Sequence, residues 1–130
     1  FESNEVLRVD DVLDSATVQV IAGRTHGVVA PLAVEASGDG RYIYIVGHGS
    51  NRVLVVDSSS TGVRSIPCGC QAAGLRRLAD GDTFELTRDR TGAVAILRTN
   101  QGEPLSFYVA PAQLAPRGHG QSRSLQRRRD

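Results

Sequence analysis

The sequence predicts an all-β protein made of antiparallel four-stranded meander repeats. The clearest repeat is residues 31–66, which contain the apolar runs LAV, YIYIV and VLVV and end in a shorter run, VRSI. Clusters of Gly, Asp, Asn and Ser separate these runs, as turns separate the strands of a meander. Residues 74–109 contain a second, weaker copy of the same order. Helical patterns are nearly absent, because only residues 71–78 and 110–114 have room for a helical turn.

The strands can be placed from the N-terminus onward. Residues 4–9 and 16–21 read as a strand pair, with a turn around Asp10–Ser15, and Val28-Val29 adds a short extended piece. Pro31 then begins the first meander, since proline cannot donate a hydrogen bond into a sheet ladder. Its strands are expected at 32–34, 41–46, 52–57 and 63–66.

The central runs of the first meander are apolar at consecutive positions. This pattern is typical of a strand that is covered on both faces. Gly38-Asp39-Gly40 supplies the positive φ angles of the tight turn before RYIYIV. The second copy is expected to have strands at 74–78, 83–87, 93–97 and 105–109, with turns at 80–82 and 88–92.

Composition limits the class of protein. With 130 residues, 40% hydrophobic and 22% charged, the chain is long enough for one ordinary domain with a core. The net charge of +1 argues against nucleic-acid binding, and no apolar run approaches the roughly 20 residues of a transmembrane segment. Every basic residue is Arg, for which genomic base composition is the simplest explanation. The chain begins at Phe1 and contains no Met, so we expect a mature, trimmed or fragmentary product.

The first meander resembles a blade of the YVTN-type β-propellers. The resemblance lies in the S-x-D-G turn, the apolar second strand, the V-x-V-x-D third strand and the Ile-Pro that ends the fourth. These features correspond to Ser37, Asp39-Gly40, Tyr44-Ile45-Val46, Ser50-Asn51, Val53–Asp57, Gly62 and Ile66-Pro67. The Gly-Asp turns at 39–40 and 81–82 are about 40 residues apart, a spacing typical of propeller blades. Residues 67–111 look like the divergent last blade of some secreted bacterial propellers of this kind.

The resemblance implies four segments: a strand pair of an incomplete blade (1–22), a blade (28–67), a divergent terminal blade (68–111) and a basic disordered tail (112–130). A closed propeller needs about four blades or more. We therefore expect an incomplete ring, completed by additional blades or by a protein partner. The favoured function is a non-catalytic binding or scaffolding module outside the cytoplasm, periplasmic or secreted. The alternative is the C-terminal part of a propeller enzyme, a lactonase or quinoprotein-like dehydrogenase, with most catalytic residues elsewhere.

Cys68 and Cys70 are the only cysteines, and one residue separates them. Three interpretations remain open: a small-ring disulfide in an oxidising compartment, two free thiols, or half of a metal site. A zinc site normally needs a second ligand pair, which the three histidines do not supply at the usual spacing. A redox pair would favour C-x-x-C over C-x-C.

Five residues are candidates for a binding face at the ends and inner strands of the blades. His26 and His48 stand in turns, where a polar structural role is the simpler explanation. Glu35, Arg76 and Arg77 belong to the expected inner strands.

No catalytic motif or cofactor signature is recognisable. Asp39, Asp80 and Asp82 invite a calcium interpretation, but turn chemistry explains them better, and we predict no metal and no cofactor. Charge is uneven along the chain, with an acidic N-terminus and a basic C-terminus. The tail residues Arg123, Arg127, Arg128 and Arg129 are candidates for docking to an acidic partner.

Overall fold

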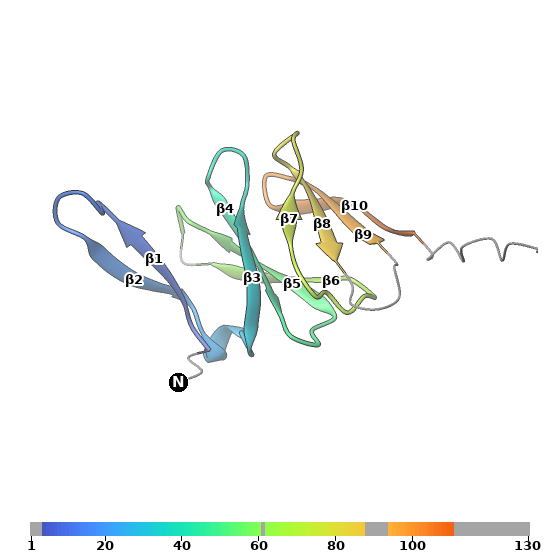
Figure 1. The fold of residues 1–130 in the computed structure, drawn as a ribbon, viewed down its shortest axis with the longest axis horizontal. Helices are drawn as coiled ribbons and strands as arrows, with labels where there is room; N and C mark the ends of the chain where they lie inside the picture. Colours follow the sequence, from blue (N-terminus) through green and yellow to red (C-terminus); the bar gives the residue numbers. More distant parts are fainter. Residues whose placement is uncertain (1–3, 61, 88–93, 111–130) are drawn as a thin grey trace, which may run out of the picture.

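The computed structural model describes residues 4–60, 62–87 and 94–110, and these form three antiparallel sheets arranged in a row (Figure 1). We call them the N-terminal pair, the middle sheet and the C-terminal sheet. The predicted all-β, antiparallel fold class is confirmed. Apart from one short 3-10 helix, η1 (Arg24–His26), the described residues contain no helix.

The N-terminal pair contains β1 (Val6–Asp10) and β2 (Thr17–Ala22). The strand order is β3-β4-β5-β6 in the middle sheet and β7-β8-β9-β10 in the C-terminal sheet. Both sheets are therefore meanders, in which each strand pairs with the next one along the chain. The middle sheet consists of β3 (Pro31–Ala36), β4 (Tyr42–Gly47), β5 (Arg52–Asp57) and β6 (Val63–Pro67). The C-terminal sheet consists of β7 (Arg76–Arg77), β8 (Thr83–Thr87), β9 (Val94–Asn100) and β10 (Glu103–Ala110).

Some strand boundaries differ from those expected. The first strand of the second copy shrinks from residues 74–78 to Arg76–Arg77, while β9 extends to Asn100. Residues 28–29 form no strand, and residues 71–75 are irregular rather than helical. The expected turn at 88–92 and residues 111–114 lie outside the described residues.

Both faces of the middle sheet are packed. In the β4–β5 register, Tyr44 and Val46 face the same side as Val55 and Val53, and this side meets the C-terminal sheet. The opposite side meets the N-terminal pair through Ile45, Leu54 and Val56, which cluster with Val6, Ala22 and Val28. The consecutive apolar residues of the sequence are therefore explained by burial on both faces, as predicted.

Tyr44 is the central contact between the two complete sheets. Its side chain is fully buried, and its ring centroid lies 4.3 Å from that of Phe84 in β8. Its hydroxyl hydrogen-bonds to Thr99 Oγ1 at 2.9 Å, and the Thr99 hydroxyl in turn donates to the carbonyl oxygen of Asp82. The buried polar groups are thus paired across the interface, which avoids the cost of an unsatisfied hydroxyl.

The Asp-Gly turns of the two sheets contact each other directly. Gly38 N donates to the Gly81 carbonyl oxygen at 2.9 Å. The turns have matching hydrogen bonds, Gly40 N to Ser37 O and Gly81 N to Leu78 O, and both glycines have a positive φ. Asp39-Gly40 therefore corresponds to Asp80-Gly81, one residue earlier than the pairing expected from the sequence. The sequence pattern was ambiguous because glycine is flanked by aspartate on both sides at 80–82.

This contact gives a matched pair of substitutions. Gly40 (φ 73°) has no atom within 4 Å of an added Cβ, so Gly40→Ala should cost only left-handed strain, about 1 kcal/mol. A Cβ on Gly81 (φ 81°) would lie 3.1 Å from the Gly38 Cα, so Gly81→Ala should cost about 1–3 kcal/mol more. Urea unfolding measures both values. Equal losses for the two variants would contradict the turn-to-turn contact.

Candidate functional site

A cavity with a mixed polar and apolar lining lies between the N-terminal pair and the middle sheet. We call this cavity of about 340 Å³ the wedge. One wall comes from β1, β2 and η1, and the other from β4, β5 and the turn after β5. Polar lining residues are Arg8, Gln19, His26, Asp57, Ser58, Ser59 and Ser60. In the β1–β2 register, Arg8 faces Gln19, which places polar side chains toward the middle sheet here.

The charged groups of the wedge are already engaged within the chain. Arg8 Nε donates to Asp10 at 2.8 Å. Asp57 accepts hydrogen bonds from the Ser59 hydroxyl and backbone N–H, and it also pairs with Arg41. These contacts lower the pKa of Asp57 from 3.8 to about 2, with the Ser59 hydroxyl as the largest cause. The wedge therefore offers a polar lining without a convergent set of reactive groups.

The two candidate histidines line different cavities. His26 lines the wedge, and its Nδ1 accepts a hydrogen bond from Gly23 N at 3.1 Å. His48 lines a second cavity of about 260 Å³, beside the β4–β5 turn. Its backbone N–H donates to the Ala30 carbonyl oxygen at 2.9 Å, which ties this turn to the segment before β3. The structure does not bring the two imidazoles together as one cluster.

The arginines of β7 have structural contacts. Arg77 Nη1 lies 3.1 Å from the carbonyl oxygens of both Ala36 and Ser37, so it links β7 to the end of β3. Arg76 forms an ion pair with Glu85, its cross-strand neighbour. Glu35 pairs in register with Tyr44, which places it on the face of β3 that is turned toward the C-terminal sheet. Arg76 and Arg77 thus belong to the contacts within and between the two complete sheets.

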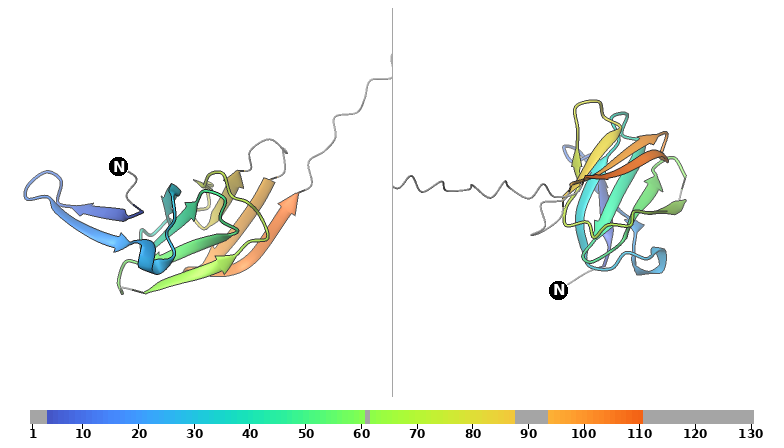
Figure 2. Two further views of the ribbon diagram at one scale, coloured as in Figure 1. Left: turned by 90° about the horizontal axis from the view of Figure 1, so that it is seen from below. Right: turned by 90° about the vertical axis from the view of Figure 1, so that its right-hand side faces the viewer.

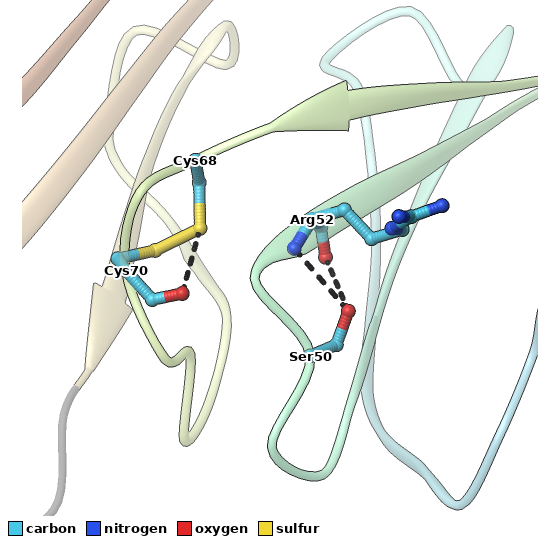
Figure 3. The surroundings of a disulfide bond; sticks show 4 residues. All are labelled: Ser50, Arg52, Cys68 and Cys70. Carbon is cyan, nitrogen blue, oxygen red and sulfur yellow. Dashed lines mark hydrogen bonds between the residues drawn. A yellow bond between two sulfur atoms is a disulfide. The ribbon is translucent and has the colours of Figure 1, made fainter.

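Cys68 and Cys70 are joined in the structure by a disulfide, with an S–S distance of 2.11 Å. Figure 3 shows the disulfide after the end of β6, beside the turn that Ser50 stabilises through hydrogen bonds to Arg52. Cys68 N donates to the Asn51 carbonyl oxygen at 2.8 Å. Both side chains are buried in the core between the two complete sheets. The disulfide thus lies where the chain crosses from the middle sheet to the C-terminal sheet.

Of the three candidate calcium ligands, Asp39 and Asp80 use their carboxylates to form turns. Asp39 accepts from the Ser37 hydroxyl and the Arg41 N–H, and Asp80 accepts from both the hydroxyl and the N–H of Thr83. The side-chain bonds from Ser37 and Thr83 are the main reason that the pKa values of Asp39 and Asp80 are lowered. Within the described ranges, no group of three or more potential ligands could hold a metal ion.

Two bare apolar surfaces are the most unusual feature of the described chain. Leu7 pairs with Val20 and Val9 with Val18, so these four residues share one face of the N-terminal pair. We call it the outer face; its side chains are about half exposed, from 48% to 62%. The second consists of Leu32 and Val34 on β3, which are 45% and 46% exposed, and the β3–β4 register assigns Val34 to the face of Ile45 while Leu32 lies at the register shift between Pro31 and Ala33. Grouped apolar side chains are less common on the surface of monomeric proteins than single exposed ones.

The comparisons with known proteins support the fold. No protein-family model matches the chain, and no curated protein matches it in sequence. Among solved structures it is similar to hydrazine synthase of Kuenenia stuttgartiensis, a β-propeller-containing protein, with a TM-score of 0.62 and 23% sequence identity. The match covers 80% of this chain and 29% of the other. The chain therefore has a propeller-like fold with an open ring, and it spans less than a third of the length of the structure that it matches.

Two further observations concern membrane spans and the predicted docking tail. No helix in the described residues is long and apolar enough to span a membrane. The arginines of the predicted docking tail lie outside the described residues, so their role stays a prediction.

The disulfide can be tested by alkylation in denaturant, where buried thiols are also accessible. Without reductant we expect no labelling, and with reductant we expect both cysteines to be labelled. Because the closed ring is only three residues long, ring closure itself contributes only about 1.5 kcal/mol. Cys68→Ser/Cys70→Ser should lower the free energy of unfolding by more than this amount, because it also buries two hydroxyl groups in the core. Labelling of both thiols without reductant would show that the disulfide is wrong.

The lowered pKa of Asp57 predicts a pH dependence. The folded-state pKa lies below the unfolded one, so the ionised carboxylate stabilises the fold above about pH 4, and this contribution is lost as the pH falls through about 2. Asp57→Asn should flatten the dependence of Tm on pH between these values, with a small effect because the group is exposed. Asp14→Asn, in the exposed β1–β2 turn, is the control. Identical pH profiles for Asp57→Asn and the parent would refute this role.

Proposed function

We propose that this chain is a non-catalytic binding or scaffolding module of a β-propeller, and that a further blade covers its outer face. The observation that carries the proposal is the outer face itself, four apolar side chains in two cross-strand pairs with nothing packed on them in the described structure. The middle sheet supports the same reasoning, since its equivalent apolar residues are buried by a sheet on each side. The outer face would therefore pack against a fourth sheet, as the three described sheets pack against one another.

The two ends of the stack differ in chemistry. On the C-terminal sheet, Phe84, Leu86, Ala95 and Leu97 face inward and are fully buried. The opposite face carries the Arg76–Glu85 ion pair and Arg98, together with the apolar Ile96, Val94 and Tyr108, of which Val94 is 36% and Tyr108 62% exposed. Terminal repeats of stacked architectures usually have a more polar outer face than internal ones. This difference favours the C-terminal sheet as the terminal blade and the N-terminal pair as the end that is continued.

Two finer parts of the proposal rest on sequence features. Kinship with the YVTN-type repeats rests on the turn and strand pattern of residues 37–67. A location outside the cytoplasm, in the periplasm or secreted, rests on the close cysteine pair, since disulfides persist in oxidising compartments. The alternative of a propeller enzyme has less support, because the charged residues of the wedge are already engaged, Arg8 by Asp10 and Asp57 by Ser59.

The proposal can be tested with the full chain by size-exclusion chromatography with light scattering. A bare outer face should drive association as the concentration rises, giving masses above the 13.9 kDa of one chain. Val18→Glu places a charge on that face and should restore the monomer, because burying an unpaired charge is costly. Val12→Glu is the control, since Val12 is exposed in the adjacent turn. A cooperatively unfolding parent monomer at all concentrations would overturn the proposal.

A further inference from the structure

The cavity beside the β4–β5 turn differs from the wedge in its charge. We call this cavity of about 260 Å³ the turn cavity. His48 and Arg52 line it, and its described lining contains no aspartate or glutamate. In the wedge, by contrast, Arg8 is paired with Asp10. Arg52 forms no ion pair with any residue that the structure describes. The turn cavity therefore has a positive charge that the described part of the chain leaves uncompensated.

The floor of the turn cavity is apolar. It is formed by Val28, Ile45 and Leu54, which are 2%, 1% and 6% exposed because they belong to the core between the N-terminal pair and the middle sheet. Arg52 precedes Leu54 by two positions on β5, so alternation places both side chains on this face. Figure 3 shows the Arg52 side chain extending away from the disulfide. Because Arg52 and His48 are exposed, the cavity has polar donors at its mouth above an apolar floor.

The walls of the turn cavity are fixed by contacts within the chain. In the left view of Figure 2, η1 lies at the junction between the N-terminal pair and the middle sheet, and residues 27–29, which follow it, form one wall. A Cβ on Gly47 would lie only 2.5 Å from the Val29 carbonyl oxygen, so the β4–β5 turn packs directly on this wall. On the other side of the turn, the Asn51 carbonyl oxygen accepts a hydrogen bond from Cys68 N. A cavity held from both sides can receive a ligand without a large ordering cost.

We propose that the turn cavity binds a small carboxylate that carries an apolar body. The Arg52 guanidinium pairs with the carboxylate, to which its planar fork of N–H groups is suited, and the apolar body packs on the floor. The volume lies below the roughly 300–1,000 Å³ that is typical of pockets for drug-sized ligands, so the ligand is a smaller molecule, such as one of the size of benzoate. This site goes beyond the proposed function and does not depend on it, because no residue of the outer face lines the turn cavity.

The experiment titrates the isotope-labelled full chain with benzoate and follows the backbone amide shifts by NMR. We expect saturable shifts in residues 27–29 and 47–52, with half-saturation at about millimolar concentration for so small a ligand. Benzamide is the matched neutral probe, because it has nearly the same shape without the charge, and it should bind more weakly by about threefold or more. Inorganic phosphate should also bind more weakly than benzoate, because it has no apolar body to cover the floor.

Arg52→Gln should weaken benzoate binding by about threefold or more, and Arg98→Gln should leave it unchanged. Arg98 is the matched control because it is also exposed and lies on the outward face of the C-terminal sheet. Unchanged thermal unfolding shows that each variant is folded, and the comparison of the three probes on the parent chain tests the inference even if a variant fails to fold.

Four results would overturn the inference. They are no saturable shifts around the turn cavity, benzamide binding as tight as that of benzoate, phosphate binding as tight as that of benzoate, or unchanged benzoate binding by the folded Arg52→Gln chain. None of them would alter the mass shift caused by Val18→Glu, which tests the proposed function separately.

Discussion

The packing of the middle sheet on both faces is the constraint on which the rest of the structure depends. Alternating residues of β4 and β5 supply two apolar surfaces, one led by Tyr44 and the other by Ile45. Neither surface can face water without a cost of roughly 25 cal/mol for each Å² of apolar area. A sheet of this kind therefore requires apolar cover on each side. The N-terminal pair supplies only part of the cover on its own side, and the bare residues of β3 are the direct consequence.

The contact between the two Asp-Gly turns explains why the complete sheets share one geometry. Gly38 and Gly81 approach so closely that the added Cβ of either would lie within 3.2 Å of the other's Cα. The ends of β3 and β7 are then held by Arg77, which donates to two carbonyl oxygens of the middle sheet. Disulfide, turn contact and arginine bridge all lie between the same two sheets. These two sheets consequently form the most strongly connected part of the described chain, and the N-terminal pair has far fewer polar links to it.

Much of the fold was predictable because its signals are local. Consecutive apolar residues identified β4 and β5, and Gly-Asp turns identified the hairpin before each second strand. The short β7 was overestimated because Leu75 and Leu78 resemble strand residues, although Leu75 packs in the core outside the ladder. The roles of the candidate site residues were harder to predict. Nothing local distinguishes Arg77, which bridges two sheets, from Arg76, which pairs with its cross-strand neighbour, because the difference depends on residues about 40 positions away.

The exposed apolar residues acquire meaning only through register. An exposed valine or leucine is ordinary by itself. Leu7, Val9, Val18 and Val20 become a surface because two cross-strand pairs place them on one face. Val34 becomes significant because its ladder partner Ile45 is buried while Val34 is not. A charged residue on the outer face or at position 34 would make the packing of a further sheet unfavourable there. The Arg76–Glu85 ion pair adds charge of this kind to the outward face of the C-terminal sheet. The outward face of the C-terminal sheet thus combines an ion pair with exposed apolar side chains, whereas the outer face of the N-terminal pair groups four apolar side chains, and this difference is the physical basis of the proposed function.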